Sequence, residues 1–355
     1  MAAIEHKIAI GLAATLAGGY LMSRFLNYHP LAVREEECRN NSDAPPLSPG
    51  QPIKVVTYNT QFFSGTDYHF FYDGGADALV DRVDVRRTVA GVSAFLANEN
   101  PDFVLLQEVD CGARRTGYLN QVELLRNSLP NDLRNCVATL YWKSKFVPHP
   151  RVMGSVGTKL VIFSRYQLEK STRYQLPRTP GNPIVADFNF KRALLEVEIP
   201  LADGRTFYLL NTHLEAFPNG TDVMRRQVDH VLLKLEALDK KNVPWIIGGD
   251  FNLLPPGQWR RLNAEERGCH REQSEIFAIY ERYHGVPTIS HASGEQMQDF
   301  FTFTKRIKEQ RVPIRTLDYF FASEDVRING YAVRQEGVKS LSDHLPLVAE
   351  FTLAG

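Results

Sequence analysis

Polar side chains that can transfer protons or bind metal ions recur where apolar stretches of this chain end. The stretches are rich in Val, Ile and Leu, and they are typical of buried β-strands. The polar residues are Asn59, Glu108, His213, Asp250 with Asn252, Asp318, and Asp343 with His344. In sheet proteins ligands bind at strand ends, because loops vary there while the sheet holds their bases in place. We therefore interpret these residues as a candidate site rather than as turn residues.

The side-chain types in this set indicate metal-assisted hydrolysis. The carboxylates of Glu108, Asp250 and Asp343, together with the asparagine amide oxygens, suit Mg²⁺ or Mn²⁺ better than zinc, which prefers sulfur and nitrogen. His213 and His344, beside acidic residues, suit proton transfer and oxyanion stabilisation near neutral pH. The chain contains no Gly-x-Ser-x-Gly elbow and no P-loop. The set therefore predicts a metal-dependent phosphoester hydrolase.

The composition is that of an ordinary soluble globular protein. Of 355 residues, 43% are hydrophobic and 23% are charged, and 41 basic residues balance 41 acidic ones. These values exclude a mostly disordered chain and a polytopic membrane protein. Neutral charge also argues against a dedicated non-specific nucleic-acid binder, although a local basic groove is compatible with it. The four scattered cysteines exclude a zinc knuckle and leave disulfides open.

The elements that must position the candidate site alternate between strand-like and helix-like patterns. We expect helices over 82–98 and 224–238, where apolar residues recur at helical spacing. We expect strands over 53–59, 102–108, 159–164, 193–199, 206–214, 243–249, 316–321, 327–334 and 345–353. A hairpin turn at 202–204 and the interleaved helices imply mixed sheets. This pattern predicts an α/β domain over 53–355, with two mixed β-sheets packed face to face and helices outside.

An apolar run, Ile8–Met22, lies near the N-terminus between Lys7 and Arg24. Its fifteen residues are short for a membrane span of about 20, but they fit a signal peptide or a tilted anchor. A buried helix is the alternative. We expect residues 1–26 to form a signal or anchor segment and the proline-rich residues 27–52 to form a linker. The catalytic domain would then be membrane-anchored or exported, outside the cytoplasm.

The motifs around the candidate residues resemble those of the endonuclease/exonuclease/phosphatase superfamily, over residues 53–354. The matching segments are Thr57-Tyr-Asn59, Gln107-Glu108, Asn211-Thr-His213, Gly249-Asp-Phe-Asn252, Leu317-Asp318-Tyr319 and Ser342-Asp343-His344. The superfamily includes deoxyribonuclease I, abasic-site endonucleases, inositol polyphosphate 5-phosphatases and neutral sphingomyelinases. The resemblance implies a four-layer α/β sandwich and a divalent-metal phosphohydrolase. His213 is similar to a histidine that the deoxyribonuclease I and sphingomyelinase branches keep and the abasic-site branch lacks.

The resemblance also implies a role for each residue. Glu108 would be the main Mg²⁺ ligand (Mn²⁺ being the alternative), with Asn59 beside it and Asp343 completing the shell. Asp250 would orient or deprotonate the attacking water, and Asn252, two residues on, would hydrogen-bond a phosphoryl oxygen.

His344, oriented by Asp318, and His213 would neutralise charge at the scissile phosphate. We expect a monomer that hydrolyses a phosphodiester of lipid or nucleic acid. We favour lipid, because the apolar run near the N-terminus would hold the domain at a membrane. The alternatives are an exported DNase-like endonuclease and a catalytically inactive binding module.

Three further features have two interpretations each. Lys191-Arg192 opens an expected strand and either reaches a phosphate or forms a solvated edge. Lys159, near Gly154-Ser-Val-Gly157, carries the same ambiguity. The aromatic run Tyr68–Tyr72 either forms a loop that faces the substrate or the membrane, or packs locally.

Overall fold

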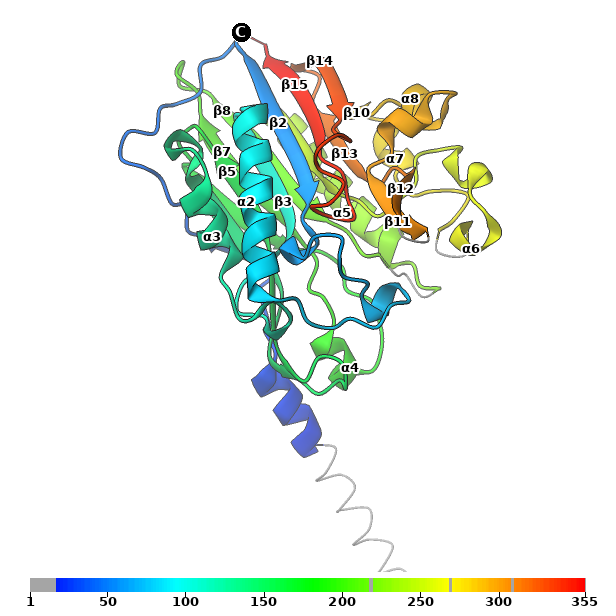
Figure 1. The fold of residues 1–355 in the computed structure, drawn as a ribbon. Helices are drawn as coiled ribbons and strands as arrows, with labels where there is room; N and C mark the ends of the chain where they lie inside the picture. Colours follow the sequence, from blue (N-terminus) through cyan, green and yellow to red (C-terminus); the bar gives the residue numbers. More distant parts are fainter. Residues whose placement is uncertain (1–16, 217–219, 268–269, 308–309, 355) are drawn as a thin grey trace, which may run out of the picture.

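Two β-sheets packed face to face, with helices on their outer surfaces, form the body of the molecule (Figure 1). The structure is a computed structural model that describes residues 17–216, 220–267, 270–307 and 310–354. Residues of the first sheet and of the second meet in one apolar core that includes Leu105, Ile162, Leu195 and Leu209. The expected four-layer α/β sandwich is confirmed.

The first sheet has seven strands. In pairing order they are β1 (Val33–Glu36), β6 (Lys170–Gln175), β7 (Ala193–Pro200), β8 (Thr206–His213), β9 (Trp245–Asp250), β13 (Asp318–Ala322) and β10 (His284–Val286). Only β8 and β9 run parallel, and the helix α5 (Val223–Asp239) connects them, as a parallel pair requires. The C-terminal ends of β8 and β9 therefore meet at the same edge of the sheet.

The second sheet has six strands and, like the first, contains one parallel pair that a helix connects. In pairing order they are β14 (Val326–Val333), β15 (Leu347–Leu353), β2 (Pro52–Asn59), β3 (Phe103–Asp110), β5 (Gly154–Ser164) and β4 (Asn135–Val147). The strands β2 and β3 are parallel, and α2 (Arg82–Glu99) connects them. A separate hairpin pairs β11 (Phe303–Ile307) with β12 (Gln310–Arg315).

The outer layers are helical. On the six-stranded sheet, α2 buries Val85, Val89, Val92 and Leu96, together with α3 (Gln121–Ser128). Asp81 caps the start of α2 by accepting the Val83 N–H at 2.7 Å. On the seven-stranded sheet, α5 packs with α7 (Phe277–Tyr280). Short segments complete the list: α4 (Pro183–Phe188), α6 (Ala264–Arg267), α8 (Ile289–Ser293), and the 3₁₀ turns η1 (Gln61–Phe63), η2 (Phe71–Asp73), η3 (Arg114–Thr116), η4 (Asn131–Leu133), η5 (Gln258–Arg261) and η6 (Met297–Phe300).

The N-terminal region adds to this body. The apolar run 8–22 lies largely outside the described residues. The described residues 17–26 form a helix that projects away from the sheets (Figure 1). Within the described chain, no helix combines the length and apolarity needed to cross a bilayer. The segment 27–52, which we expected to connect run and domain, contributes β1 and buries Leu47 against the core.

Candidate active site

The site is built at the edge where β8, β9 and β13 end or begin. The register places His213 of β8 and Asp318 of β13 on either side of Asp250, the last residue of β9. Gly249 allows this arrangement, because its φ of 147° and a Cβ position 2.0 Å from the Thr212 carbonyl oxygen leave room for no other residue. Three chemically active side chains therefore stand in one row across the sheet.

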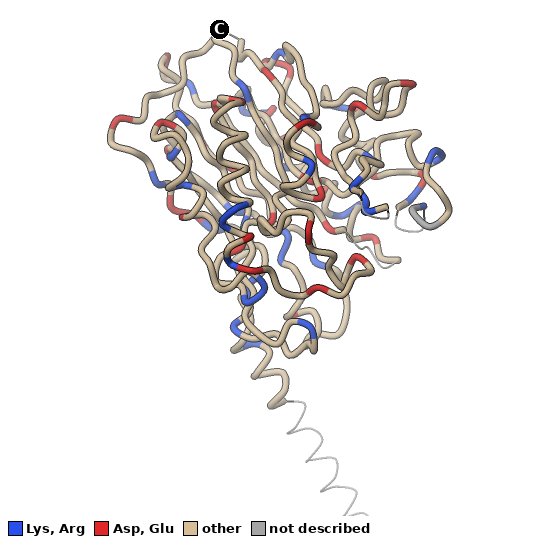
Figure 2. Tube along the Cα trace, viewed as in Figure 1, with Lys and Arg blue, Asp and Glu red and all other residues tan. Residues whose placement is uncertain are grey.

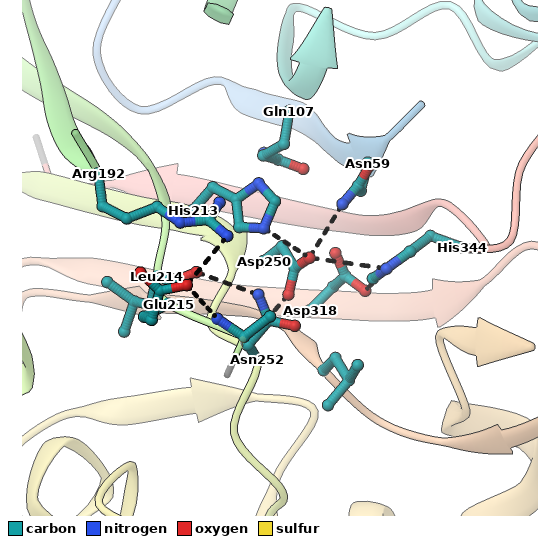
Figure 3. A network of polar contacts seen from close by, with 12 residues as sticks. Asn59, Gln107, Arg192, His213, Leu214, Glu215, Asp250, Asn252, Asp318 and His344 are labelled. Atoms are coloured by element: carbon teal, nitrogen blue, oxygen red, sulfur yellow. Dashed lines mark hydrogen bonds and ion pairs between the residues drawn. The ribbon is translucent and has the colours of Figure 1, made fainter. Parts of the chain in front are cut away.

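Asp250 is the centre of the polar network (Figure 3). Its Oδ2 accepts a hydrogen bond from Asn59 Nδ2 at 3.0 Å and lies 3.4 Å from His213 Nε2 and 3.6 Å from His344 Nε2. Its Oδ1 accepts the Asn252 N–H at 2.9 Å. The carboxylate is 1% exposed, so these contacts hold it in one orientation.

Asn252 is placed by a turn rather than by an extended strand. The chain leaves β9 after Asp250, and Asn252 has a left-handed backbone with a φ of 53°. Its Nδ2 donates to the Leu214 carbonyl at 3.1 Å, which leaves the second N–H of this amide for another acceptor.

His344 is oriented from the opposite side by Asp318. His344 Nδ1 and Asp318 Oδ2 are 2.7 Å apart, and both side chains are buried. Ser342 fixes the preceding loop, since its hydroxyl donates to the Asn59 carbonyl and accepts the His344 N–H. This pair leaves His344 Nε2 directed at Asp250 and the cavity.

Electrostatics differentiate the two histidines. Burial disfavours the charged form of His344, but the carboxylates of Asp318 and Asp250 outweigh it and raise its pKa to about 10. Burial, followed by the nearby charges of Arg192 and His344, holds the pKa of His213 well below its usual range. Burial raises the pKa of Asp250 to about 6, against the opposing effect of His344. At neutral pH, Asp250 is therefore ionised, His344 is charged and His213 is neutral.

Glu108 stands apart from this network, on β3 of the other sheet. A β-bulge between Leu106 and Val109 gives it a left-handed backbone with a φ of 59° and turns its side chain into the cavity. Burial and then Asp343 raise the pKa of Glu108 to about 7, although Arg115 and Arg192 lower it. Two carboxylates held close together without a cation between them destabilise each other's charge.

A cavity of about 530 Å³ connects all of these groups except Asp318, which lies behind His344. Its cationic lining residues are Arg115, Arg151, Arg192, Lys305 and Arg315. Its aromatic lining includes Phe62, Phe70, Phe71, Tyr72, Tyr141, Trp142, Phe190 and Phe303. A volume of this size suits a small-molecule group or one residue of a polymer.

A family model identifies this architecture. The model of the Endonuclease/Exonuclease/phosphatase family matches residues 56–344. The chain belongs to this family. Members of the family are hydrolases, phosphatases and nucleases. A search of curated protein sequences gave no match.

Solved structures of family members have the same fold. An endonuclease/exonuclease/phosphatase from Beutenbergia cavernae is 20% identical, with a TM-score of 0.59, covering 86% of this chain and 72% of that one. The catalytic domain of human Nocturnin is 17% identical, with a TM-score of 0.51 and coverages of 88% and 97%. A mannosyl-6-phosphatase from Bacteroides thetaiotaomicron is 17% identical, with a TM-score of 0.52 and coverages of 85% and 100%.

The residues of this family member fit a divalent cation. Glu108 and Asp343 offer hard oxygen ligands on one side of the cavity, and the charge of Asp343 adds to burial in raising the pKa of Glu108. The tightest group of possible ligand atoms is instead Asp250, Asp318 and His344, within 4.8 Å of one another. The hydrogen bond between His344 and Asp318 already accounts for that closeness, so among the described residues the Glu108 side offers the carboxylates that are free to hold a cation.

The structure brings together all eight residues predicted from the sequence. Asn59 is seen as a donor to Asp250, and its Oδ1 accepts the Gln61 N–H at 3.1 Å, so a role as metal ligand would use the second lone pair of that oxygen.

Sequence reasoning did not select Arg115, Tyr141 or Trp142, and it left Arg192 undecided. Arg192 is 3% exposed and lines the cavity, whereas Lys191 is buried outside it and donates to the Asp187 and Asn189 carbonyls. Lys159 is not among the cavity-lining residues. Phe70, Phe71 and Tyr72 of the aromatic run face the cavity. In the sequence, the cavity-lining arginines and aromatic residues appear only as an arginine or an aromatic run beside a strand. That pattern is too common to identify a binding site.

Proposed function

We propose that this protein is a divalent-metal-dependent hydrolase of phosphodiesters. The observation that carries the proposal is the orientation of Asp250, which Asn59, Asn252 and two histidines hold at the cavity wall in its ionised form. A buried carboxylate fixed in this way can accept a proton from water at neutral pH.

The residues divide the chemistry as follows. Asp250 holds and deprotonates the attacking water, and the free N–H of the Asn252 amide donates to a phosphoryl oxygen. His344, kept charged by Asp318, neutralises or protonates the leaving oxygen. His213 is neutral and has a single N–H; with this proton on Nε2, 3.4 Å from Asp250 Oδ2, it would also donate to a phosphoryl oxygen, while Nδ1 would accept from the Tyr141 hydroxyl. Attack by water is in line, with no covalent enzyme intermediate.

A divalent cation would be held by Glu108 and Asp343, with Asn59 beside them, and Mg²⁺ suits these oxygen ligands, with Mn²⁺ as the alternative. When bound there, it would supply positive charge to the phosphate oxygens.

The finer proposal concerns the substrate. We favour a lipid or another membrane-proximal phosphodiester, because the cavity has aromatic walls contributed by Phe70, Phe71 and Tyr72. The helix over 17–26 also exposes Leu21, Met22 and Phe25. Basic and acidic residues are interspersed along the chain (Figure 2), which suits a small substrate better than a long polyanion.

The runner-up is a DNase-like endonuclease, and the observation in its favour is the set of five cationic residues that line the cavity. Among the structural neighbours, the mannosyl-6-phosphatase is named for a sugar phosphate, and a zebrafish TDP2 structure contains a single-stranded DNA product. A simple phosphodiester that favours neither class of substrate is therefore the right first test.

The test is hydrolysis of bis-p-nitrophenyl phosphate with Mg²⁺ or Mn²⁺, with and without EDTA. We expect activity that EDTA abolishes, and we expect Asp250→Asn to lose about 10²–10⁴-fold in kcat. Metal-independent hydrolysis, or no hydrolysis of any phosphoester in a panel, would show that the chain is not this enzyme. The second outcome would favour the inactive binding module.

We also propose that the catalytic domain works outside the cytoplasm, attached through its N-terminal segment. Fractionation of full-length protein and of a variant lacking residues 1–27 tests this. We expect truncation to release the protein from the membrane fraction. A full-length protein that fractionates as cytosolic, with a location that truncation leaves unchanged, would contradict the proposal.

A further inference from the structure

Arginine side chains lie on the aromatic rings along one side of the cavity. We call this surface the arginine-capped wall. It consists of Phe62, Arg115, Tyr141, Trp142, Phe190 and Arg192. Arg115 Cζ is 3.3 Å from the Phe62 ring centroid and 5.7 Å from that of Trp142. Arg192 Cζ is 4.3 Å from the Phe190 centroid and 5.4 Å from that of Tyr141. The ring centroids of Trp142 and Phe190 lie 4.6 Å apart, so the part of the wall around Arg115 is in contact with the part around Arg192.

This arrangement opposes the binding of a cationic head group. Aromatic cages bind quaternary ammonium ions through the negative faces of their rings. Here guanidinium groups already occupy the faces of Phe62 and Phe190. An ammonium group in the same space would lose that attraction and meet the like charge of Arg192 at short range.

Arg192 is in addition a buried donor with unused hydrogen-bonding capacity. Its Nε and Nη1 atoms have no partner, and its only ion pair is a 3.6 Å contact between Nη2 and Glu215 Oε1 among the described residues. Figure 3 shows Arg192 next to His213, on the side of Asp250 away from His344. Buried donors without acceptors are costly, so an acceptor oxygen on the substrate would be stabilised here.

Four acidic residues of the described chain line the cavity without belonging to the wall: Glu108, Asp250 and Asp343 at the catalytic end, and Asp73, which interacts with the charges of Asp343, Arg311 and Arg315. Arg115 and Arg192 lower the pKa of Glu108, and His344 lowers that of Asp250; a metal ion held by Glu108 and Asp343 would balance the charge that remains. Asp110 pairs with Arg115 through two contacts of 2.8 and 2.9 Å, so it offers no free charge to a ligand. Asp110 offsets the charge of Arg115 in the same way, so the positive charge that the wall presents beside the scissile phosphate comes mainly from Arg192, whose contact with Glu215 is longer.

We propose that the arginine-capped wall selects substrates by the charge of the group next to the scissile phosphate. An anionic or uncharged group is accepted, with its acceptor atoms on Arg192, and a cationic head group such as choline is excluded. The inference rests on the proposed function, and among membrane lipids it points to acidic or neutral head groups rather than choline-bearing ones.

Two esters of the same shape isolate the charge. One is p-nitrophenyl phosphorylcholine, and the other is the p-nitrophenyl 3,3-dimethylbutyl phosphodiester, in which carbon replaces the choline nitrogen. We expect the full-length protein with Mg²⁺ to prefer the uncharged ester by about 10- to 100-fold in kcat/KM, the effect of one like charge at short range in a partly buried site. Equal values for the two esters would overturn the proposal.

Variants then assign the selection to Arg192. Arg192→Gln should lower the preference to within about threefold, and Arg192→Lys, which keeps the charge, should retain it. The matched control is Arg173→Gln, which removes a buried guanidinium of β6 that contacts the Leu140 and Lys191 carbonyls outside the cavity wall. Because the readout is a ratio, partial unfolding cancels. A preference that survives Arg192→Gln would refute the role of Arg192.

Binding separates this inference from the proposed function. Calorimetric titration of Asp250→Asn protein with each ester, in the presence of Mg²⁺, compares affinities without turnover. Tighter binding of the uncharged ester supports charge selection even if the wild-type protein hydrolyses neither, a result that would refute only the proposed function. Equal affinities would refute charge selection, whatever the activity.

Discussion

Replacing Asp318 by asparagine should shift the alkaline limb of the pH–activity profile to lower pH. The 2.7 Å contact between Asp318 Oδ2 and His344 Nδ1 is the closest charge contact of this histidine, while Asp250 Oδ2 lies 3.6 Å from Nε2. Together these carboxylates raise the pKa of His344 from 6.5 to about 10. Asparagine keeps the size of the side chain and removes its charge, so the pKa of His344 falls back towards 6.5.

The magnitude follows from the charged fraction of His344. With a pKa of about 10 the imidazolium persists to high pH, whereas near 6.5 only about 1% of it remains at pH 8.5. Asp318→Asn should therefore lose up to about 100-fold in kcat/KM at pH 8.5, but only a few-fold near pH 6. The loss appears on the alkaline side because His344 stays protonated only below its pKa, and the variant lowers that pKa.

The assay is kcat/KM for bis-p-nitrophenyl phosphate between about pH 5.5 and 9.5 at saturating Mg²⁺. The control is Asp239→Asn, a carboxylate that accepts hydrogen bonds from Trp245 Nε1 and Tyr283 at 2.7 and 2.6 Å, away from the site. It should leave the profile unchanged. An Asp318→Asn variant with the wild-type alkaline limb would refute the assignment of His344 as the charged group.

Three further predictions concern the remaining charges. Glu108→Gln should raise the Mg²⁺ concentration for half-maximal activity by at least about tenfold, measured by metal titration; an unchanged value would remove Glu108 from the metal site. Because burial raises the pKa of Asp250 to about 6, and only the ionised form accepts a proton, kcat/KM should fall about tenfold per pH unit below that value. A flat acid profile would contradict this role. Arg115→Met leaves Asp110 buried without its cation, so the free energy of unfolding in urea should fall by about 3–5 kcal/mol. Adding Asp110→Asn should restore part of it, and no restoration would argue against the pair.

Much of the fold was predictable because its strongest signals are local. The apolar runs before Asn59, Glu108 and Asp250 became β2, β3 and β9, since buried strands need continuous apolar sequence. The periodic segment starting at Arg82 became α2 for the same reason. Strands with weaker patterns were missed. In β1 and β6 the polar residues of Val33–Glu36 and Lys170–Gln175 pair at the sheet edge, where burial is incomplete.

The residues of the candidate site could also be selected from the sequence by itself. Asp250, His344 and Glu108 were identifiable because strand-end acids and histidines have few structural reasons to recur in that order. Their positions along the chain, however, say nothing of distance. The register of β8, β9 and β13, and the packing of two sheets, decided that His213, Asp250 and His344 meet.

Only the tertiary structure decided where Arg192 lies and what it contacts. In the sequence it is an arginine at the start of a strand, as compatible with solvent as with a ligand. Tyr141 of β4, about fifty residues earlier, and Phe190 cover it, and Glu215 after β8 only partly balances its charge. Burial, the neighbouring rings and unpaired donors are properties of segments distant in the chain that pack together. They turn an ordinary basic residue into a buried cation at the cavity wall.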